Sequence, residues 1–450
     1  MITIFKSALI ITMDPERKIW NNASLVIQDD RIIAIGRDEE IEAKYHPDVI
    51  KDCKGKVLLP GFINLHTHQT LSIIRGVAED MGTAPAYTKS VPQGYQLLPQ
   101  ESETMALLGA AEAVKFGSTY ICDMYTNCEA SAMAFRKIGI RASVCEMVHD
   151  MDFSTLYKRV YQVDETLGEE ILQRNIQFIE RWEKDSLITP CISVHAPDTC
   201  SASFIRKIMK LKEKYGVKLA VHLAQSKGEI EQVQKVTGGK SPVEFFYEMG
   251  VLGPDTLAAH CIYVNDTDVN ILSRTHTNIV HIPEGNAKGG MVAPLEQFRS
   301  KNINITLGTD NGSADMIDAM RIGLCINRVR TNSFSIMPMN MLEMATINAA
   351  KAIGRQNELG SLEEGKLADL LVVDFHAPHL IPCLNPVGTL IHTGLGSDIE
   401  QVYVNGKQVV DQGKVINIDE QEVLKEAQLV AEKKWLDVNK GINPYFFIHL

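Results

Sequence analysis

Short apolar runs alternate with segments of helical periodicity through the middle of the chain, and this alternation constrains the fold more than any other feature. Helical patterns such as ESETMALLGAAEAVKFG lie between most of the runs. Near-continuous apolar strands separated by helices are typical of a parallel sheet covered by helices. The alternation predicts the α/β class and a (β/α)8 TIM barrel over residues 57–359. The runs are VLLPGFINLH, STYICDMY, IRASVCEMV, ITPCISVHA, VKLAVHLAQ, TLAAHCIYV, TNIVHIP and INITLGTD.

Both ends of the chain have a different pattern, with short strands and hairpin turns. SLVIQDDRIIAIG (24–36) has two apolar runs around Asp29-Asp30, and QVYVNGKQVVDQGKV (401–415) contains Asn405-Gly406, a strong hairpin signal. We therefore expect residues 1–56 and 360–417 to form one small β-sandwich domain. Residues 418–437 have helical periodicity, so residues 418–450 are predicted to be a C-terminal helix and tail.

Composition and charge exclude several classes of partner. The chain has 450 residues and a formal net charge of −11, which argues against a nucleic-acid or anionic-membrane binder, because either would need a basic face. No apolar stretch reaches about 18 residues and no signal peptide is evident. The nine cysteines include no CxxC pair, which favours buried thiols in a reducing compartment over disulfides. We expect a cytoplasmic protein that acts on a small molecule.

Metal-competent side chains follow the apolar runs. His66 and His68 in INLHTH stand at positions i and i+2, so both imidazoles point to one face of a strand. His222, His260 and Asp310 each come where another run ends, and strand ends meet at one face of a barrel. Nitrogen and carboxylate ligands without thiolate favour Zn²⁺, with Fe²⁺ or Mn²⁺ as alternatives. A bound divalent ion lowers the pKa of its water toward about 7, which creates a hydroxide nucleophile.

The order HxH, His, His, Asp resembles the amidohydrolase superfamily, and more narrowly its branch of guanine deaminases, adenosine-type deaminases and chlorotriazine hydrolases. The resemblance covers nearly the whole chain and implies one divalent ion held by His66, His68, His222 and Asp310. It implies that Asp310 also accepts the water's proton and that His260 is the catalytic histidine beside the ion. It further implies a homo-oligomer, a dimer or larger. Other similar stretches are LLPGFINLHTHQTLSIIRG, FGSTYICDMY, VHAPDTCS, LGTDNGSADMIDAMR and LGSLEEGKLADLLVVD.

Three further residues are candidates for substrate contact. His195 in VHAPDTCS is expected to donate a hydrogen bond to a substrate carbonyl or ring nitrogen, or else to fix a loop. Arg75 in IIRG contacts a substrate anion or forms a loop-fixing ion pair. Glu146 in SVCEMVHD is a wall carboxylate of the pocket or a ligand of a second metal. The fourth run has no lysine, which two-metal members of the superfamily often carboxylate there, so one metal is favoured.

Two motifs depart from the deaminase pattern. Deaminases of this branch carry His-x-x-Glu, whose glutamate shuttles protons, whereas this chain has Gln225, which cannot exchange a proton at neutral pH. The seventh run continues as HIPEGNAKGG where similar proteins have PxSN, and Glu284 is the candidate stand-in for the proton carrier. The segment at 79–100 should cover the pocket and set specificity, with Tyr87 and Tyr95 available to stack on a planar substrate or to pack on the rim.

Three functions remain open at this stage. The first is hydrolytic deamination of a planar nitrogen heterocycle of purine, pyrimidine or triazine type. The second is hydrolysis of an amide, urea or ring C–N bond, or release of another leaving group, for which the missing glutamate is no obstacle. The third is a catalytically weakened metal-binding protein.

Overall fold

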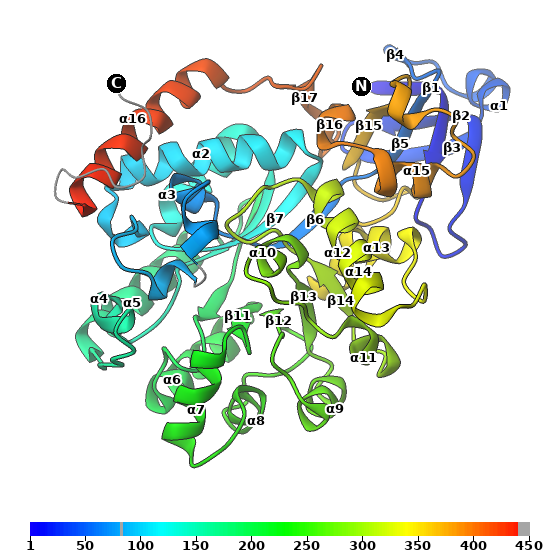
Figure 1. The fold of residues 1–450 in the computed structure, drawn as a ribbon. Helices are drawn as coiled ribbons and strands as arrows, with labels where there is room; N and C mark the ends of the chain where they lie inside the picture. The colour runs from blue at the N-terminus through cyan, green and yellow to red at the C-terminus, as the bar shows by residue number, and fades with distance from the viewer. Residues whose placement is uncertain (82–83, 440–450) are drawn as a thin grey trace.

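The computed structural model describes residues 1–81 and 84–439 and contains parallel strands, one large mixed sheet and surrounding helices (Figure 1). All eight apolar runs predicted as strands are confirmed. The first run is split by Gly61 and the fourth by Cys191. The resulting strands are β6 (Phe62–Thr67), β7 (Ser118–Met124), β8 (Arg141–Cys145), β9 (Ile188–Pro190), β10 (Ile192–Val194), β11 (Leu219–Leu223), β12 (Thr256–His260), β13 (Asn278–His281) and β14 (Ile305–Leu307).

These strands pair in parallel with their neighbours in the chain. One sheet has the order β6-β7-β8-β9 and a second has the order β10-β11-β12-β13-β14. Cys191 alone separates β9 from β10, and an isolated parallel bridge joins Thr67 at the end of β6 to Asp310 beyond β14. The strand residues are almost all buried, as expected for parallel strands covered on both faces. Their carboxyl ends therefore share one side of the molecule.

Both chain ends contribute to one nine-stranded sheet with the order β18-β17-β16-β15-β5-β1-β2-β3, in which β4 pairs with β1. The predicted hairpins are confirmed, with Gln28 opposite Arg31 and Val404 opposite Lys407. The expected boundary at residue 57 falls inside β5, which belongs to this sheet. The strands are β1 (Ile2–Ile11), β2 (Ile19–Gln28), β3 (Arg31–Arg37), β4 (Val49–Asp52), β5 (Lys56–Pro60), β15 (Leu370–Asp374), β16 (Ile399–Val404), β17 (Lys407–Asp411) and β18 (Lys414–Val415).

Helices follow most of the parallel strands, and local capping sets their ends. α6, for example, begins after Ser201, whose Oγ accepts a hydrogen bond from Phe204 N, and it ends at Gly216, whose φ of +64° is easiest for glycine. The helices of this part are α2 (Pro99–Lys115), α3 (Cys128–Ile138), α4 (Phe153–Leu156), α5 (Glu165–Trp182), α6 (Ala202–Tyr215), α7 (Lys227–Thr237), α8 (Pro242–Glu248), α9 (Asp266–Arg274), α10 (Pro283–Lys288), α11 (Leu295–Ser300), α12 (Met316–Thr331), α13 (Pro338–Ala345) and α14 (Ile347–Ala352). α1 (Asp38–Lys44) packs on β2 and β3 of the nine-stranded sheet, and α15 (Pro386–Thr393) packs on α12 and α13.

The predicted C-terminal helix is confirmed as α16 (Glu420–Val438), which runs along α2 (Figure 1). Lys433 Nζ lies 3.0 Å from Glu101 Oε1, and Trp435 Nε1 donates a 2.8 Å hydrogen bond to the Ile73 carbonyl. The rest of the predicted tail, from residue 440, lies outside the described residues.

The structure bears on two further expectations. All nine cysteines are free thiols and seven of them are buried, as expected. Within residues 1–81 and 84–439, no helix combines the length and the apolar character that crossing a bilayer requires.

Candidate metal centre

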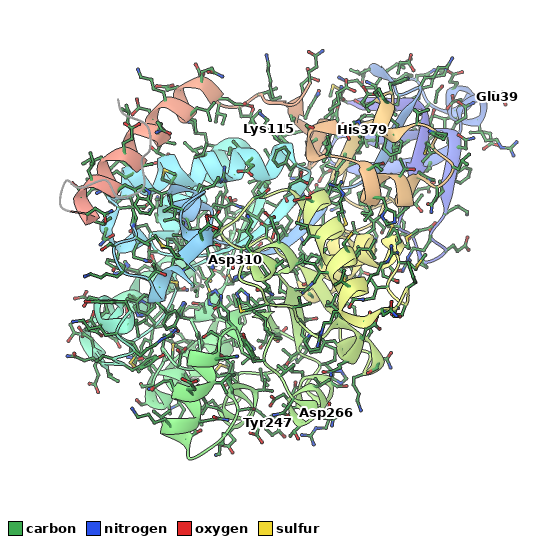
Figure 2. The ribbon with its side chains drawn as sticks, in the orientation of Figure 1. Glu39, Lys115, Tyr247, Asp266, Asp310 and His379 are labelled. Carbon is green, nitrogen blue, oxygen red and sulfur yellow. The ribbon has the colours of Figure 1, made fainter. Side chains whose placement is uncertain are left out.

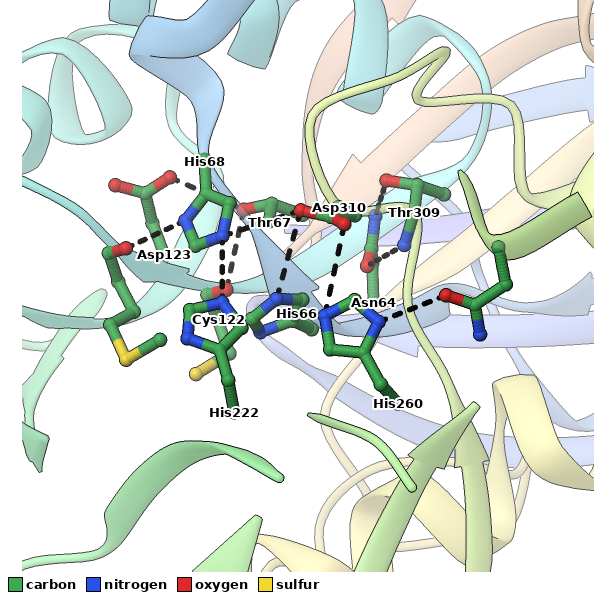
Figure 3. Close-up of polar contacts among 12 residues, drawn as sticks. Asn64, His66, Thr67, His68, Cys122, Asp123, His222, His260, Thr309 and Asp310 are labelled. Atoms are coloured by element: carbon green, nitrogen blue, oxygen red, sulfur yellow. Dashed lines mark hydrogen bonds and ion pairs between the residues drawn. The ribbon is translucent and has the colours of Figure 1, made fainter. Parts of the chain in front are cut away.

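The side chains predicted as metal ligands come together at the carboxyl ends of the parallel strands (Figure 3). His66 lies in β6 and His68 directly follows that strand. His222 lies in β11, His260 is the last residue of β12, and Asp310 follows β14. Figure 2 shows Asp310 near the middle of the molecule. Segments far apart in the sequence thus present their polar groups to one point.

Two of the histidines direct unprotonated nitrogens at each other. His68 Nδ1 lies 2.6 Å from the Met124 carbonyl, and His222 Nδ1 lies 2.8 Å from the His195 carbonyl. A carbonyl only accepts hydrogen bonds, so both Nδ1 atoms carry the proton and both Nε2 atoms carry a lone pair. The two Nε2 atoms are 3.2 Å apart. Lone pairs at this distance repel each other unless a cation lies beside them, so this pair of histidines fits a metal site.

Asp310 adds a carboxylate to the same point. Its Oδ1 lies 3.3 Å from His68 Nε2 and 3.8 Å from His66 Nε2, and its Oδ2 lies 3.9 Å from His260 Nε2. The Nε2 atoms of His66 and His260 are buried and have no hydrogen-bond partner within the described part of the chain. Ligand atoms of His66, His222 and His260 lie within 4.8 Å of one another, as do those of His66, His68 and Asp310. The donor set fits one divalent cation.

Burial keeps these histidines neutral, which ligation requires. Desolvation lowers the pKa of His68 to about 4 and that of His222 to about 3. The same cause lowers the pKa of His260 and takes that of His66 well below its usual value. A neutral imidazole keeps the lone pair that a metal binds, so the site is ready for a cation at neutral pH.

The backbone at two of these residues is strained, and local hydrogen bonds hold it. His260 has φ +74° and Asp310 has φ +60°, a region that non-glycine residues adopt at a cost of about 1–3 kcal/mol. Asp310 N donates to the His66 carbonyl at 2.9 Å, and the neighbouring Thr309 exchanges two hydrogen bonds with Asn64. Strain of this kind is common where a side chain must be aimed at a functional site.

Asp123, which the sequence analysis did not single out, has a buried carboxyl group next to the metal-ligand cluster. It lies in β7, close to His68 (Figure 3). Its Oδ1 accepts a hydrogen bond from Gln69 N at 2.7 Å, which fixes the turn directly after His68. Burial raises its pKa to about 7. An acidic residue inside the apolar run STYICDMY was the available signal for a polar contact at this strand end.

A cavity opens above the cluster. His68, His222 and Asp310 form its floor, and Glu79, Tyr87 and Gln225 are among its walls. The Glu79 Oε2 atom is buried and has no partner within the described residues, so it can accept a hydrogen bond from a bound molecule. The other lining residues are Leu71, Ile74, Ala78, Ala84, Pro85, Ala86, Gln93, Tyr125, Met147, His195, Ala196, Gly285, Asn286, Lys288, Gly289, Met291, Asn311 and Gly312.

His195 lines this cavity beside the ligands. Its Nδ1 lies 2.7 Å from Thr199 Oγ1, and that hydroxyl lies 3.3 Å from the Ala196 carbonyl, to which it donates. Nδ1 is thus committed to this hydroxyl, and Nε2 is the nitrogen that a bound molecule can contact.

Asn286, which the sequence analysis overlooked, orients His260. His260 Nδ1 lies 3.0 Å from Asn286 Oδ1, so it donates to the amide oxygen. Asn286 occupies the last position of Pro283-Glu284-Gly285-Asn286, where the PxSN pattern also ends in asparagine. That agreement was the sequence signal for its role.

Of the two residues at the altered motifs, Gln225 contacts the cavity directly and Glu284 does so only through another side chain. Gln225 is one of its walls, whereas the described lining residues do not include Glu284. Glu284 Oε1 pairs with Lys288 Nζ at 2.8 Å, and Lys288 does line the cavity. Burial raises the pKa of the Glu284 carboxyl group. Its link to the site therefore runs through Lys288.

Arg75 and Glu146 are not brought to the cavity. Arg75 forms an ion pair with Glu112, whose other oxygen accepts a hydrogen bond from Ala314 N, so this pair fixes a loop. Glu146 lies on the far side of its strand, where its Oε1 accepts from Cys128 N at 3.2 Å and lies 3.6 Å from Arg174 Nε. It lines a second cavity with these residues, apart from the histidines, whereas the next residue, Met147, lines the cavity at the histidines.

Comparison with known proteins agrees with this geometry. The model of the amidohydrolase family matches residues 57–409. The 5'-deoxyadenosine deaminase of Methanosarcina acetivorans is 33% identical over 439 residues, which cover 96% of this chain and 98% of the relative. The 5-methylthioadenosine/S-adenosylhomocysteine deaminase of Syntrophobacter fumaroxidans is 31% identical over 94% of this chain and 96% of its own length.

Solved structures share the fold. An adenosine deaminase from Xanthomonas campestris with bound zinc superposes with a TM-score of 0.86 at 20% identity, over 96% of this chain and 98% of its own. A triazine hydrolase from Arthrobacter aurescens superposes with a TM-score of 0.83 at 18% identity, over 96% and 99%. The family match and the relatives at 30% identity or more together show that this chain belongs to the amidohydrolase family.

Proposed function

We propose that this enzyme removes an exocyclic amino group from a purine by hydrolysis, and that its substrates resemble 5'-deoxyadenosine. The observation that carries the proposal is the convergence of four neutral histidines and Asp310 on the floor of a cavity. Relatives similar over nearly the whole length are named as deaminases of 5'-deoxyadenosine and 5-methylthioadenosine, which supports a purine nucleoside as the substrate class.

His66, His68, His222 and Asp310 are the residues that would hold one divalent ion, and we propose Zn²⁺. Three imidazole nitrogens and one carboxylate are a donor set that zinc accepts readily, and no thiolate lies among them. A divalent ion bound there supplies a water molecule of lowered pKa, and hence a hydroxide nucleophile near neutral pH.

Asp310 is the proton acceptor for that water, and His260 orients it. Asp310 has one oxygen toward His68 and the other toward His260, so it can take a proton from the attacking water on the cavity side. The Nε2 atom of His260 has a free lone pair, because its Nδ1 proton is committed to Asn286. His260 can therefore orient the nucleophile by accepting a hydrogen bond from it.

The cavity walls offer complementary groups to a flat heterocycle. His195 presents its Nε2 atom to a polar group of the heterocycle, and Tyr87 presents an aromatic ring. One Glu79 oxygen has no partner among residues 1–81 and 84–439, so it can accept from a hydroxyl group of an attached sugar. Gln225 can donate to a ring nitrogen but cannot carry a proton to it.

The missing glutamate leaves a second function open. Release of a leaving group that needs no protonation, as in a triazine hydrolase, requires the nucleophile and Asp310 but no acid at position 225. The structural similarity to triazine hydrolase is compatible with this alternative. Glu284, acting through Lys288, is the remaining candidate for the proton carrier if the leaving group is ammonia.

We further propose that the parallel strands close into a (β/α)8 barrel over about residues 62–359. The bridge between Thr67 and Asp310 joins the first strand to the segment after the last strand. Only Cys191 separates β9 from β10, so these two count as a single barrel strand. The nine-stranded sheet folds on itself as a small sandwich, because the rings of Phe5 in β1 and Tyr403 in β16 lie 5.0 Å apart although β5 and β15 separate these strands. By analogy with other members of the family, we propose a homo-oligomer.

Ammonia release by the zinc-loaded enzyme tests the proposal. Incubation with 5'-deoxyadenosine should release ammonia, and Asp310→Asn should lower turnover at least about a hundredfold, in line with loss of a general base. The variant's metal content decides whether that loss is chemical or due to an empty site. Chloride release from a chlorotriazine without ammonia from any purine would favour the alternative function. No turnover of either compound by fully loaded enzyme would contradict both.

A further inference from the structure

A buried carboxyl group fixes the part of the cavity wall that carries Tyr87. Tyr87 ends the short turn Pro85–Tyr87, and its hydroxyl donates a 2.7 Å hydrogen bond to Asp198 Oδ2. The Arg159 guanidinium lies 4.9 Å from the centre of the Tyr87 ring. The hydroxyl is thus committed to Asp198, and the ring is the part of Tyr87 that a ligand can contact.

Asp198 lies behind the cavity wall that His195 and Ala196 form, and it does not line the cavity itself. It follows His195 by three residues and only 3% of its surface is exposed. The titratable groups that act on its pKa are Tyr87, Tyr161 and Arg159, and its own charge acts on the pKa of Glu229. A fully buried carboxyl group needs such partners, because burial without them would cost several kcal/mol.

Glu229 fixes the third wall, which contains Gln225. Its Oε1 accepts from Ala224 N at 2.7 Å and its Oε2 accepts from Gln225 N at 2.8 Å. Ala224 has φ +51°, so the turn after β11 is strained and depends on these two hydrogen bonds. Glu229 is 2% exposed and lies in the first turn of α7, so its carboxyl group is held in place.

Burial raises the pKa of both acids. For Glu229, burial together with the charge of Asp198 raises the pKa to about 8. The geometry gives each acid its own part of the wall: Asp198 holds the Tyr87 hydroxyl, and Glu229 holds the turn that carries Gln225.

We propose that Asp198 and Glu229 are positioning residues, which hold Tyr87 and Gln225 in the cavity wall and so determine which flat heterocycles fit the cavity. The inference rests on the proposed function for its substrate class, because it assigns the specificity of the same site. Neither acid contacts the reacting atoms; both act through the residues that they hold.

Hydrogen–deuterium exchange of residues 84–97 in the zinc-loaded enzyme tests the positioning without any substrate. Tyr87→Phe and Asp198→Ala should each speed exchange in this segment at least about fivefold, because both remove the same buried hydrogen bond. Asp198→Asn should restore slow exchange, since an amide oxygen still accepts from the hydroxyl. Asp268→Asn is the matched control, because Asp268 is equally buried and accepts from the Ser241 hydroxyl away from the cavity. Unchanged exchange in Tyr87→Phe would overturn the proposal, even if Asp198→Ala failed to fold.

Kinetics with 5'-deoxyadenosine tests the effect on specificity. Tyr87→Phe and Asp198→Ala should raise KM about tenfold and change kcat less than about threefold, and the double variant should resemble either single one because the two residues share one interaction. Additive effects, or a loss confined to kcat, would contradict a positioning role. If the unmodified enzyme does not turn over 5'-deoxyadenosine, the proposed function fails, but the exchange experiment still decides whether Asp198 holds the cover segment.

Discussion

At the scale of single residues, the direction of each histidine proton decides what the centre can do. Backbone carbonyls take the Nδ1 protons of His68 and His222, and Asn286 takes that of His260. Burial lowers the pKa of each ring, so the rings do not relieve their mutual repulsion by becoming protonated. Their lone pairs therefore remain available to a cation, which is the arrangement that metal ligation requires.

The first prediction separates Gln225 from Glu284 as the group that governs proton delivery. Gln225→Glu should leave the zinc content unchanged, because Gln225 lines the cavity and does not belong to the metal-donor set. The same variant should raise the rate of ammonia release if the unmodified enzyme lacks a proton carrier. Glu284→Gln should lower turnover about tenfold or more and shift the pH profile if Glu284 acts through Lys288. A Glu284→Gln enzyme with unchanged turnover and pH profile would exclude Glu284 as the proton carrier.

The second prediction concerns how stability depends on pH. The pKa of Glu229 is about 8 in the folded protein and its ordinary value is 4.5, so between these values the folded state holds a proton that the unfolded state has released. The contribution of Glu229 to the free energy of unfolding is therefore fully present below about pH 4.5. It is lost as pH rises toward about 8, by at most about 1.4 kcal/mol per pH unit. Urea unfolding at a series of pH values should show a shallower decline for Glu229→Gln than for the unmodified protein. Equal slopes would mean that Glu229 is ionised in the folded state.

At the scale of elements, the predicted strand ends were a reliable guide to the metal ligands but a poor guide to other polar residues. His66, His68, His222 and Asp310 converge because parallel strands align their carboxyl ends, and this follows from the sequence pattern alone. Glu146 also follows a strand, yet it is buried beside a separate cavity with Cys128 and Arg174. A residue just beyond a strand has no fixed face, so its side could not be predicted.

The third prediction addresses the close approach between β14 and β6. A Cβ atom at Gly308 would lie 2.8 Å from the Cβ atom of His66 and equally close to Ile282. Gly308→Ala should therefore displace His66, lower the zinc content and reduce the free energy of unfolding by about 1–3 kcal/mol, as overpacking does. Gly253→Ala is the matched control, because nothing lies within 4 Å of its added carbon. Full zinc occupancy in Gly308→Ala would show that the strands separate without moving the ligand.

At the scale of the whole molecule, contacts between distant segments were beyond sequence analysis. The hairpins of both chain ends were predictable from turn residues such as Asn405-Gly406, but the order in which β1, β5 and β15 pair was not. The Tyr87–Asp198 hydrogen bond joins residues 111 positions apart, and no local sequence pattern predicts such a contact. Periodicity reports which face of an element is buried, whereas pairing order depends on the packing of the entire chain.

The last prediction tests how the nine-stranded sheet stabilises the parallel strands. Arg141 in β8 is 1% exposed, and its Nε lies 2.8 Å from Asp369 Oδ2, next to β15. Asp369 also accepts from Asn405 N at 2.7 Å, so this carboxylate links the two parts of the fold.

Asp369→Ala should leave a buried guanidinium without its counter-charge and lower the free energy of unfolding by about 3–5 kcal/mol. Glu169→Ala, which removes an exposed ion pair with Lys207, should cost less than about 1 kcal/mol and serves as the control. Urea unfolding of both variants measures the difference. Similar losses for the two would mean that Arg141 finds other acceptors, and that the two parts of the fold are joined by apolar packing rather than by this ion pair.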